Sequence, residues 1–140
     1  VAIPRGLYFT ILTPNIESEI SLPEYILTDT SLKQISNLAS LVLGLNNTDF
    51  NLIKRSMTDL IVEPHLLNTI PFYKELKSEF KDLDVLGFGI SGFGPSIYTL
   101  TNSSVKAELS LNMFEKYYNG SKFKYNVWSS AVDMEGAELE

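Results

Sequence analysis

The 140-residue sequence contains no cysteine and a single histidine, His65. The absence of cysteine excludes disulfide bonds, thiolate chemistry and cysteine-ligated metals. One histidine is too few for a histidine metal cluster, and we find no convincing Ser-His-Asp arrangement. The sequence therefore predicts no catalytic residue and no metal ligand within this chain.

Positive charge is also scarce. Eleven Lys and Arg residues oppose seventeen Asp and Glu residues, which gives a net charge of −6. A nucleic-acid-binding surface needs a basic face to meet phosphates, so no nucleic-acid partner is expected. No apolar run approaches the roughly 20 residues that span a bilayer. No signal-peptide pattern opens the chain either, so we expect no membrane partner and a cytoplasmic location.

What is present suits one folded domain over residues 1–140, because 44% of the residues are hydrophobic. Apolar alternation and turn residues predict strands at 7–12, on both sides of a glycine-rich turn, at 122–132, and briefly near 137–139. Helical spacing predicts helices from Thr30 or Ser31 to 45, from 48 to 61, from 71 to 83 and over 103–119. The last segment also alternates as a strand does, and helix is favoured because Ser103 can cap it.

This order predicts an α+β fold, with helices packed on one face of a largely antiparallel sheet. The first helix is expected to turn its apolar residues inward. These residues are Leu32, Ile35, Leu38, Ala39, Val42 and Leu45.

The stretch Gly87–Ser96 carries four glycines between two strand-forming segments. Glycine suits positions of positive φ, and successive backbone N–H groups in such a turn can hold an anion or a polar ligand. Its first six residues match the G-x-G-x-x-G dinucleotide fingerprint, but no helix follows directly, so that interpretation fails. A tight hairpin without any ligand remains the alternative. The chain has no G-x-x-x-x-G-K-[ST] phosphate loop of its own.

The run Ile90-Ser91-Gly92-Phe93-Gly94-Pro95-Ser96 resembles the third motif of the GHMP kinase superfamily, and most closely that of homoserine kinases. Three further segments resemble the same family in the same order. They are Leu12–Glu17, Asp49–Pro64 followed by Ile70-Pro71, and Val132–Ala137. The resemblance thus covers nearly the whole chain.

The resemblance implies a ferredoxin-like C-terminal domain of a longer two-domain enzyme. It implies transfer of the ATP γ-phosphoryl group, with Mg²⁺, to the side-chain hydroxyl of homoserine, a step of threonine biosynthesis. ATP and Mg²⁺ would be bound mainly by an N-terminal domain, so the 140 residues alone are predicted to be inactive. Ser91, Gly92 and Gly94 would form the substrate and phosphate turn. The N-terminal domain and a small amino-acid substrate are the expected partners, and a homodimer is a further candidate assembly.

The sequence departs from the family where the substrate carboxylate would be held. The family usually reads E-P-x-R, whereas Glu63-Pro64-His65-Leu66 ends in leucine. The chain has only two arginines, Arg5 and Arg55. Glu63, His65 and Arg55 are therefore the candidate pocket residues, although His65 and Arg55 also suit an exposed loop and a solvated helix.

A second departure is Phe93, which stands where the family has a small residue and could close the space for a ligand. Taken together, the departures leave three interpretations open: a kinase with a rearranged clamp, a kinase for another hydroxyl substrate, or a relative without activity. The alternative from another class is a non-catalytic ferredoxin-like module that binds a small molecule or regulates a partner.

Overall fold

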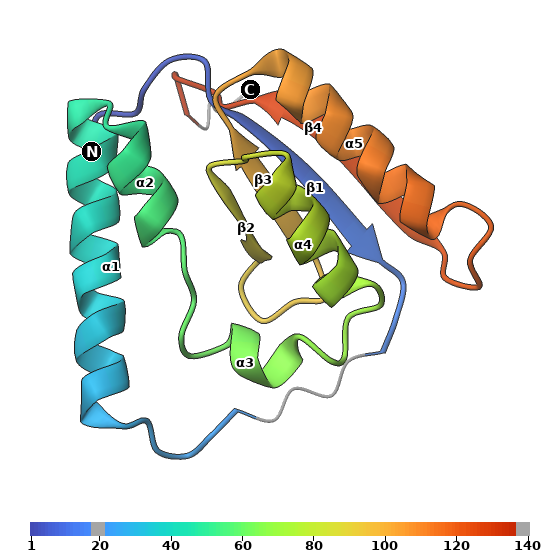
Figure 1. The fold of residues 1–140 in the computed structure, drawn as a ribbon, viewed down its shortest axis with the longest axis horizontal. Helices are drawn as coiled ribbons and strands as arrows, with labels where there is room; N and C mark the ends of the chain where they lie inside the picture. The colour runs from blue at the N-terminus through green and yellow to red at the C-terminus, as the bar shows by residue number, and fades with distance from the viewer. Residues whose placement is uncertain (18–21, 137–140) are drawn as a thin grey trace.

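A computed structural model of the protein describes residues 1–17 and 22–136. Its centre is a sheet with the order β2-β3-β1-β4, in which all neighbouring strands are antiparallel. The strands are β1 (Tyr8–Pro14), β2 (Gly87–Ile90), β3 (Ile97–Thr101) and β4 (Tyr125–Ala131). With helices between β1 and β2 and between β3 and β4, this is the ferredoxin-like α+β arrangement that the sequence predicts (Figure 1).

Helices α4 and α5 cover one face of the sheet. The helices of the chain are α1 (Thr28–Asn47), α2 (Phe50–Ser56), α3 (Glu63–Leu66), α4 (Tyr73–Asp82) and α5 (Ser104–Tyr118). Phe80 of α4 and Phe114 of α5 are fully buried against Leu12 and Ile97 of the sheet. The predicted Ser103 cap of α5 is confirmed, since the Lys106 N–H donates to Ser103 Oγ.

The other sheet face is covered as well, which the prediction of helices on one face did not include. Ile53 of α2 is buried with Leu86 and Leu100 in a second, smaller core. A Cβ placed on Gly87 would lie 2.6 Å from Met57 Cε, so Met57 lies directly against β2. Helices thus cover both faces of the sheet, with α4 and α5 on one face and α2 on the other.

The predicted inward face of α1 is largely wrong, because only Leu45 of its six members packs against a core. Leu32, Ile35 and Leu38 are 58%, 62% and 60% exposed. The side toward the protein instead carries Gln34 and Asn37, which bond to the backbone after α2. That backbone has left the helical conformation and needs hydrogen-bond partners, which these two polar side chains supply.

The predicted second helix also ends earlier than expected. It stops at Ser56, and the Asp59 carboxylate accepts the N–H groups of residues 61, 62 and 63 at 2.8, 2.8 and 3.1 Å. These bonds start the new helix α3, whose first turn contains Pro64. Proline fits a first helical turn because its missing N–H would be unpaired there anyway. The predicted last strand at 137–139 lies outside the described residues. No helix in the described part of the chain is long and apolar enough to cross a membrane.

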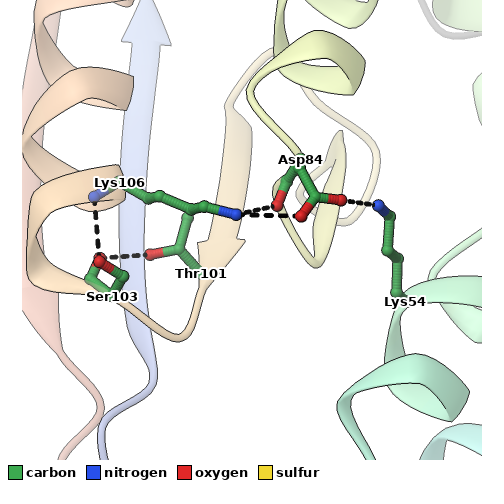
Figure 2. A network of polar contacts seen from close by, with 5 residues as sticks. All are labelled: Lys54, Asp84, Thr101, Ser103 and Lys106. Atoms are coloured by element: carbon green, nitrogen blue, oxygen red, sulfur yellow. Dashed lines mark hydrogen bonds and ion pairs between the residues drawn. The ribbon is translucent and has the colours of Figure 1, made fainter.

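Asp84 joins three elements at the end of the sheet opposite the glycine turn. It lies after α4 at a φ of 58° and forms ion pairs with Lys54 of α2 and Lys106 of α5 (Figure 2). The hydrogen bonds from Lys54 and Lys106 hold the pKa of Asp84 below its usual value of 3.8. A carboxyl whose pKa is lowered by folding stabilises the fold above its ordinary pKa and loses that effect as the pH falls.

We therefore expect Asp84→Asn to lower the melting temperature slightly at pH 7, since Asn tolerates positive φ but carries no charge. The difference from the unchanged protein should shrink as the pH falls below 3.8. Circular dichroism melts of both proteins at pH 7 and below pH 3.8 measure this difference in melting temperature. Asp82→Asn, two residues earlier and exposed, is the matched control and should change little. An Asp84→Asn deficit that stays constant with pH would contradict the role of the charge.

Candidate functional site

The glycine turn connects β2 to β3 and is closed by backbone hydrogen bonds. The Ser91 N–H donates to the Ser96 carbonyl at 2.8 Å, and the Gly94 N–H donates to the Ser91 carbonyl at 2.9 Å. Gly92 and Gly94 take φ values of 58° and 74°, a region that L side chains rarely adopt. Ser96 Oγ lies 2.8 Å from Thr13 Oγ1, which ties the turn to β1. The turn is therefore held rigidly at the end of the sheet.

A cavity of about 280 Å³ lies between this turn, β2 and the segment that follows α2. Gly92 and Glu63 both line it, so the structure brings these two predicted residues together. Gln34 and Leu41 of α1 form another part of its wall. Phe93 does not line it and is 57% exposed, so its ring leaves this space open.

Tyr98 of β3 reaches the same cavity across β2. A Cβ on Gly89 would lie only 3.1 Å from the Tyr98 hydroxyl, so Gly89 leaves the room that the tyrosine ring occupies. Phe9 packs edge-on against that ring, with 5.6 Å between centroids. The Tyr98 hydroxyl is thereby fixed near the cavity.

Glu63 is the buried charge of the site, with 6% of its surface exposed. Its backbone N–H is bound by Asp59, and its carboxylate pairs with Lys77 of α4, which is half exposed. A buried carboxylate is costly unless it is paired and hydrogen-bonded, and the Lys77 ammonium group supplies that pairing. Asp59 and Glu63 give the cavity two carboxylates and no cationic lining residue.

Two tyrosines surround this carboxylate. Burial raises the pKa of Tyr73 far above its usual value of 10, and the negative charge of Glu63 adds to the effect. Burial likewise raises the pKa of Tyr98, with further contributions from Asp59 and Glu63. Both hydroxyls therefore stay protonated at neutral pH. They can act only as neutral hydrogen-bond donors or acceptors. The Tyr73 hydroxyl is buried without a hydrogen-bond partner within residues 1–17 and 22–136.

The other predicted site residues are not among those that line the 280 Å³ cavity. His65 is exposed and lines a different hollow with Tyr25 and Leu60. Arg55 is exposed on α2 and is not among the cavity's lining residues. Ser91 contributes the backbone bonds that close the turn, and Gly94 packs toward the core.

Leu66, at the position of the family's arginine, is buried in the main core, where only 2% of its surface is exposed. A Cβ on Gly94 would lie 3.7 Å from Leu66 Cδ1. The leucine thus packs beneath the glycine turn and offers no charge to the cavity. This part of the protein therefore has no arginine clamp for a carboxylate at that position.

Sequence reasoning did not single out Asp59, Lys77 or Tyr98. Asp59 could have been noticed as a capping residue, because it precedes a Glu-Pro pair by four residues. Nothing in the pattern of α4 distinguishes Lys77 from its other lysines, and only the packing of α4 on α3 places it at Glu63. In the sequence Tyr98 is an ordinary strand residue, and only the pairing of β2 with β3 places it opposite Gly89.

A larger hollow of about 540 Å³ lies at the α5–β4 connection, lined by Asn15, Asn119 and Lys124 among others. None of the predicted site residues belongs to it. The smaller cavity is lined by the buried Glu63, so size alone does not make the larger hollow the better candidate. Among the described residues, no group of three or more His, Asp or Glu side chains could hold a metal ion.

Comparisons with known proteins show the family to which the chain belongs. Residues 41–120 match the family described as GHMP kinases C terminal. Homoserine kinase of Chloroherpeton thalassium is 31% identical over 99% of this chain, which spans 46% of that protein. Homoserine kinase of Chlorobium phaeovibrioides is 32% identical over 97% of the chain, which spans 45% of that protein.

A crystal structure of homoserine kinase from Cytophaga hutchinsonii superposes with a TM-score of 0.87 and 34% identity, covering 94% of this chain and 44% of that one. The chain thus spans less than half the length of these relatives. The region that these proteins share with the chain includes its strands and helices, the glycine turn and helix α3, which begins at Glu63. The chain belongs to the GHMP kinase family and corresponds to the C-terminal domain of homoserine kinase-like proteins.

Proposed function

We propose that this chain is the substrate-side half of an ATP-dependent kinase that phosphorylates the side-chain hydroxyl of homoserine in the cytoplasm, as a step of threonine biosynthesis. The observation that carries the proposal is the buried Glu63 carboxylate in one cavity with the open glycine turn at Gly92. A carboxylate there suits an ammonium group, and a glycine turn suits a phosphoryl group.

In this proposal the Glu63 carboxylate accepts hydrogen bonds from the ammonium group of the substrate, and Lys77 pairs with the same carboxylate. The N–H groups of Gly92 and Phe93 donate to no backbone carbonyl within the described residues, so they are free to meet phosphate oxygens. Phosphoryl transfer depends mostly on positioning and on charge stabilisation, and both groups contribute in that way. ATP and Mg²⁺ are held mainly by the N-terminal domain, which is also the partner of this domain.

The buried Leu66 favours a second candidate, a kinase for an amino alcohol without a carboxylate. Homoserine and 3-aminopropan-1-ol differ only in that carboxylate, so the pair distinguishes the two substrates directly. A non-catalytic binding module is the alternative if neither compound is phosphorylated.

We expect the full-length protein to release ADP with homoserine and MgATP in a coupled assay, and the 140-residue chain alone to release none. A kcat/KM for homoserine at least tenfold above that for 3-aminopropan-1-ol would indicate that residues other than the one at position 66 bind the substrate carboxylate. Equal values would favour the amino-alcohol substrate. No ADP release with either compound or with other small alcohols would overturn the kinase proposal.

A further inference from the structure

Helix α1 presents its apolar side to solvent. The exposed residues of this side form a stripe at helical spacing, which we call the α1 stripe. Its members are Leu32, Ile35, Leu38, Ala39, Val42 and Leu43. Ile35 is 62% exposed and Leu43 is 53% exposed. A surface helix normally turns such a stripe toward the core, so α1 is reversed relative to the usual pattern.

The orientation of α1 is fixed by polar contacts on its inner side. Gln34 Oε1 accepts the Leu60 N–H at 2.9 Å, and Asn37 Nδ2 donates to the Thr58 carbonyl at 3.3 Å. Gly44 is buried, and a Cβ there would lie 3.0 Å from both Ile53 Cγ1 and Ile53 N. Rotating the helix to bury the stripe would break these bonds and bring side chains against α2. The exposure of the stripe is therefore a property of the packed domain.

A contiguous apolar surface of this kind on a folded domain marks an interaction site. Two observations indicate what covers it. The chain spans only 44–46% of the relatives in question, so more than half of such a protein lies outside it. In addition, the Ala2 N–H donates to Asn46 Oδ1 at 2.8 Å, so a preceding polypeptide would enter beside the C-terminal end of α1 (Figure 1).

From these observations we infer that the α1 stripe is the docking surface for the N-terminal domain of the full-length protein. The inference rests on the proposed function in that it requires a two-domain protein. It also links docking to the site, because the inner side of α1 contributes Gln34 and Leu41 to the cavity beside Gly92. The N-terminal domain would then hold α1 from outside while the substrate contacts the wall that α1 helps to form.

Thiol labelling tests the inference without relying on catalysis. The 140 residues contain no cysteine, so an introduced thiol can be followed by its own reaction rate. Ile35→Cys places a thiol in the middle of the stripe, and Leu38→Cys gives a second position. Lys33→Cys, exposed on another side of the same helix, is the matched control. Each variant is made in the 140-residue chain and in the full-length protein, with the unsubstituted full-length protein as background and circular dichroism as the check of folding.

We expect the stripe thiols to react at least tenfold more slowly in the full-length protein than in the 140-residue chain, and Lys33→Cys to react alike in both. Equal rates for the stripe thiols in both proteins would overturn the inference. If the stripe thiols were already protected in the 140-residue chain, and more so at higher protein concentration, the stripe would bind a second copy of the chain. That result would also overturn the inference. Protection in a full-length protein that phosphorylates no alcohol would uphold the docking surface while the kinase proposal fails.

Discussion

Replacing Glu63 by glutamine in the full-length protein is expected to lower kcat/KM for homoserine about 100-fold, equivalent to about 2.7 kcal/mol. Glutamine keeps the size of the side chain but removes the charge that would bind the substrate ammonium group. Because that contact exists both before and during phosphoryl transfer, most of the loss should appear in KM rather than in kcat. Steady-state kinetics with homoserine measure both constants.

The matched control is Glu79→Gln on α4. Glu79 pairs with Lys116 and Tyr117 on the surface and lies outside the cavity, so kcat/KM should stay within twofold of the unsubstituted protein. Thermal melts of both variants show whether either has lost its fold, since Glu63→Gln also leaves Lys77 without its partner. A folded Glu63→Gln protein with unchanged kcat/KM would remove Glu63 from the proposed substrate site.

Replacing Phe80 by alanine is expected to destabilise the domain by about 3–5 kcal/mol, which is a large part of the stability of an ordinary domain. The ring is fully buried, and its centroid lies 5.1 Å from that of Phe88 and 5.0 Å from that of Phe114. Alanine would leave a cavity where α4, α5 and β2 meet. These elements are held by their other core contacts and cannot move together to fill it. Denaturant unfolding at 25 °C measures the loss, together with a fall in melting temperature of about 10–15 °C.

Phe93→Ala is the control for this variant, because it removes the same ring from the tip of the glycine turn, where the side chain is 57% exposed. Its effect on the free energy of unfolding should stay within about 0.5 kcal/mol. If the two variants lost similar stability, the assignment of Phe80 to the centre of the core would be wrong.

The local elements were largely predictable because their signals lie close together in the sequence. Ser103 caps α5 through the Lys106 N–H, and the capping residue decided correctly between helix and strand for 103–119. The strands beside the glycine turn pair as expected, from Gly87 opposite Leu100 to Ile90 opposite Ile97. The α+β class followed from the order of these elements, and the ferredoxin-like fold was implied by the family resemblance.

The candidate site was predictable only in part. Sequence reasoning named Gly92 and Glu63, which line one cavity, but it also named His65 and Arg55, which do not. His65 is only two residues from Glu63, yet neighbouring positions on a helical turn point in different directions. Lys77 was missed because its contact with Glu63 crosses from α4 to α3.

By itself, the sequence determined most of the segments that form helices and strands, though not the break between α2 and α3. It also determined the glycine turn and excluded cysteine chemistry from these 140 residues. It also carried the GHMP kinase resemblance, because all these signals depend on residues close together along the chain. Only the tertiary structure decided which side of α1 faces the protein. The hydrogen bonds of Gln34 and Asn37 and the close approach of Gly44 to Ile53 outweigh the apolar periodicity of the helix. Packing likewise decided that Leu66 is a core residue and that Glu63 is the buried charge beside the glycine turn, since both depend on contacts between segments distant in sequence.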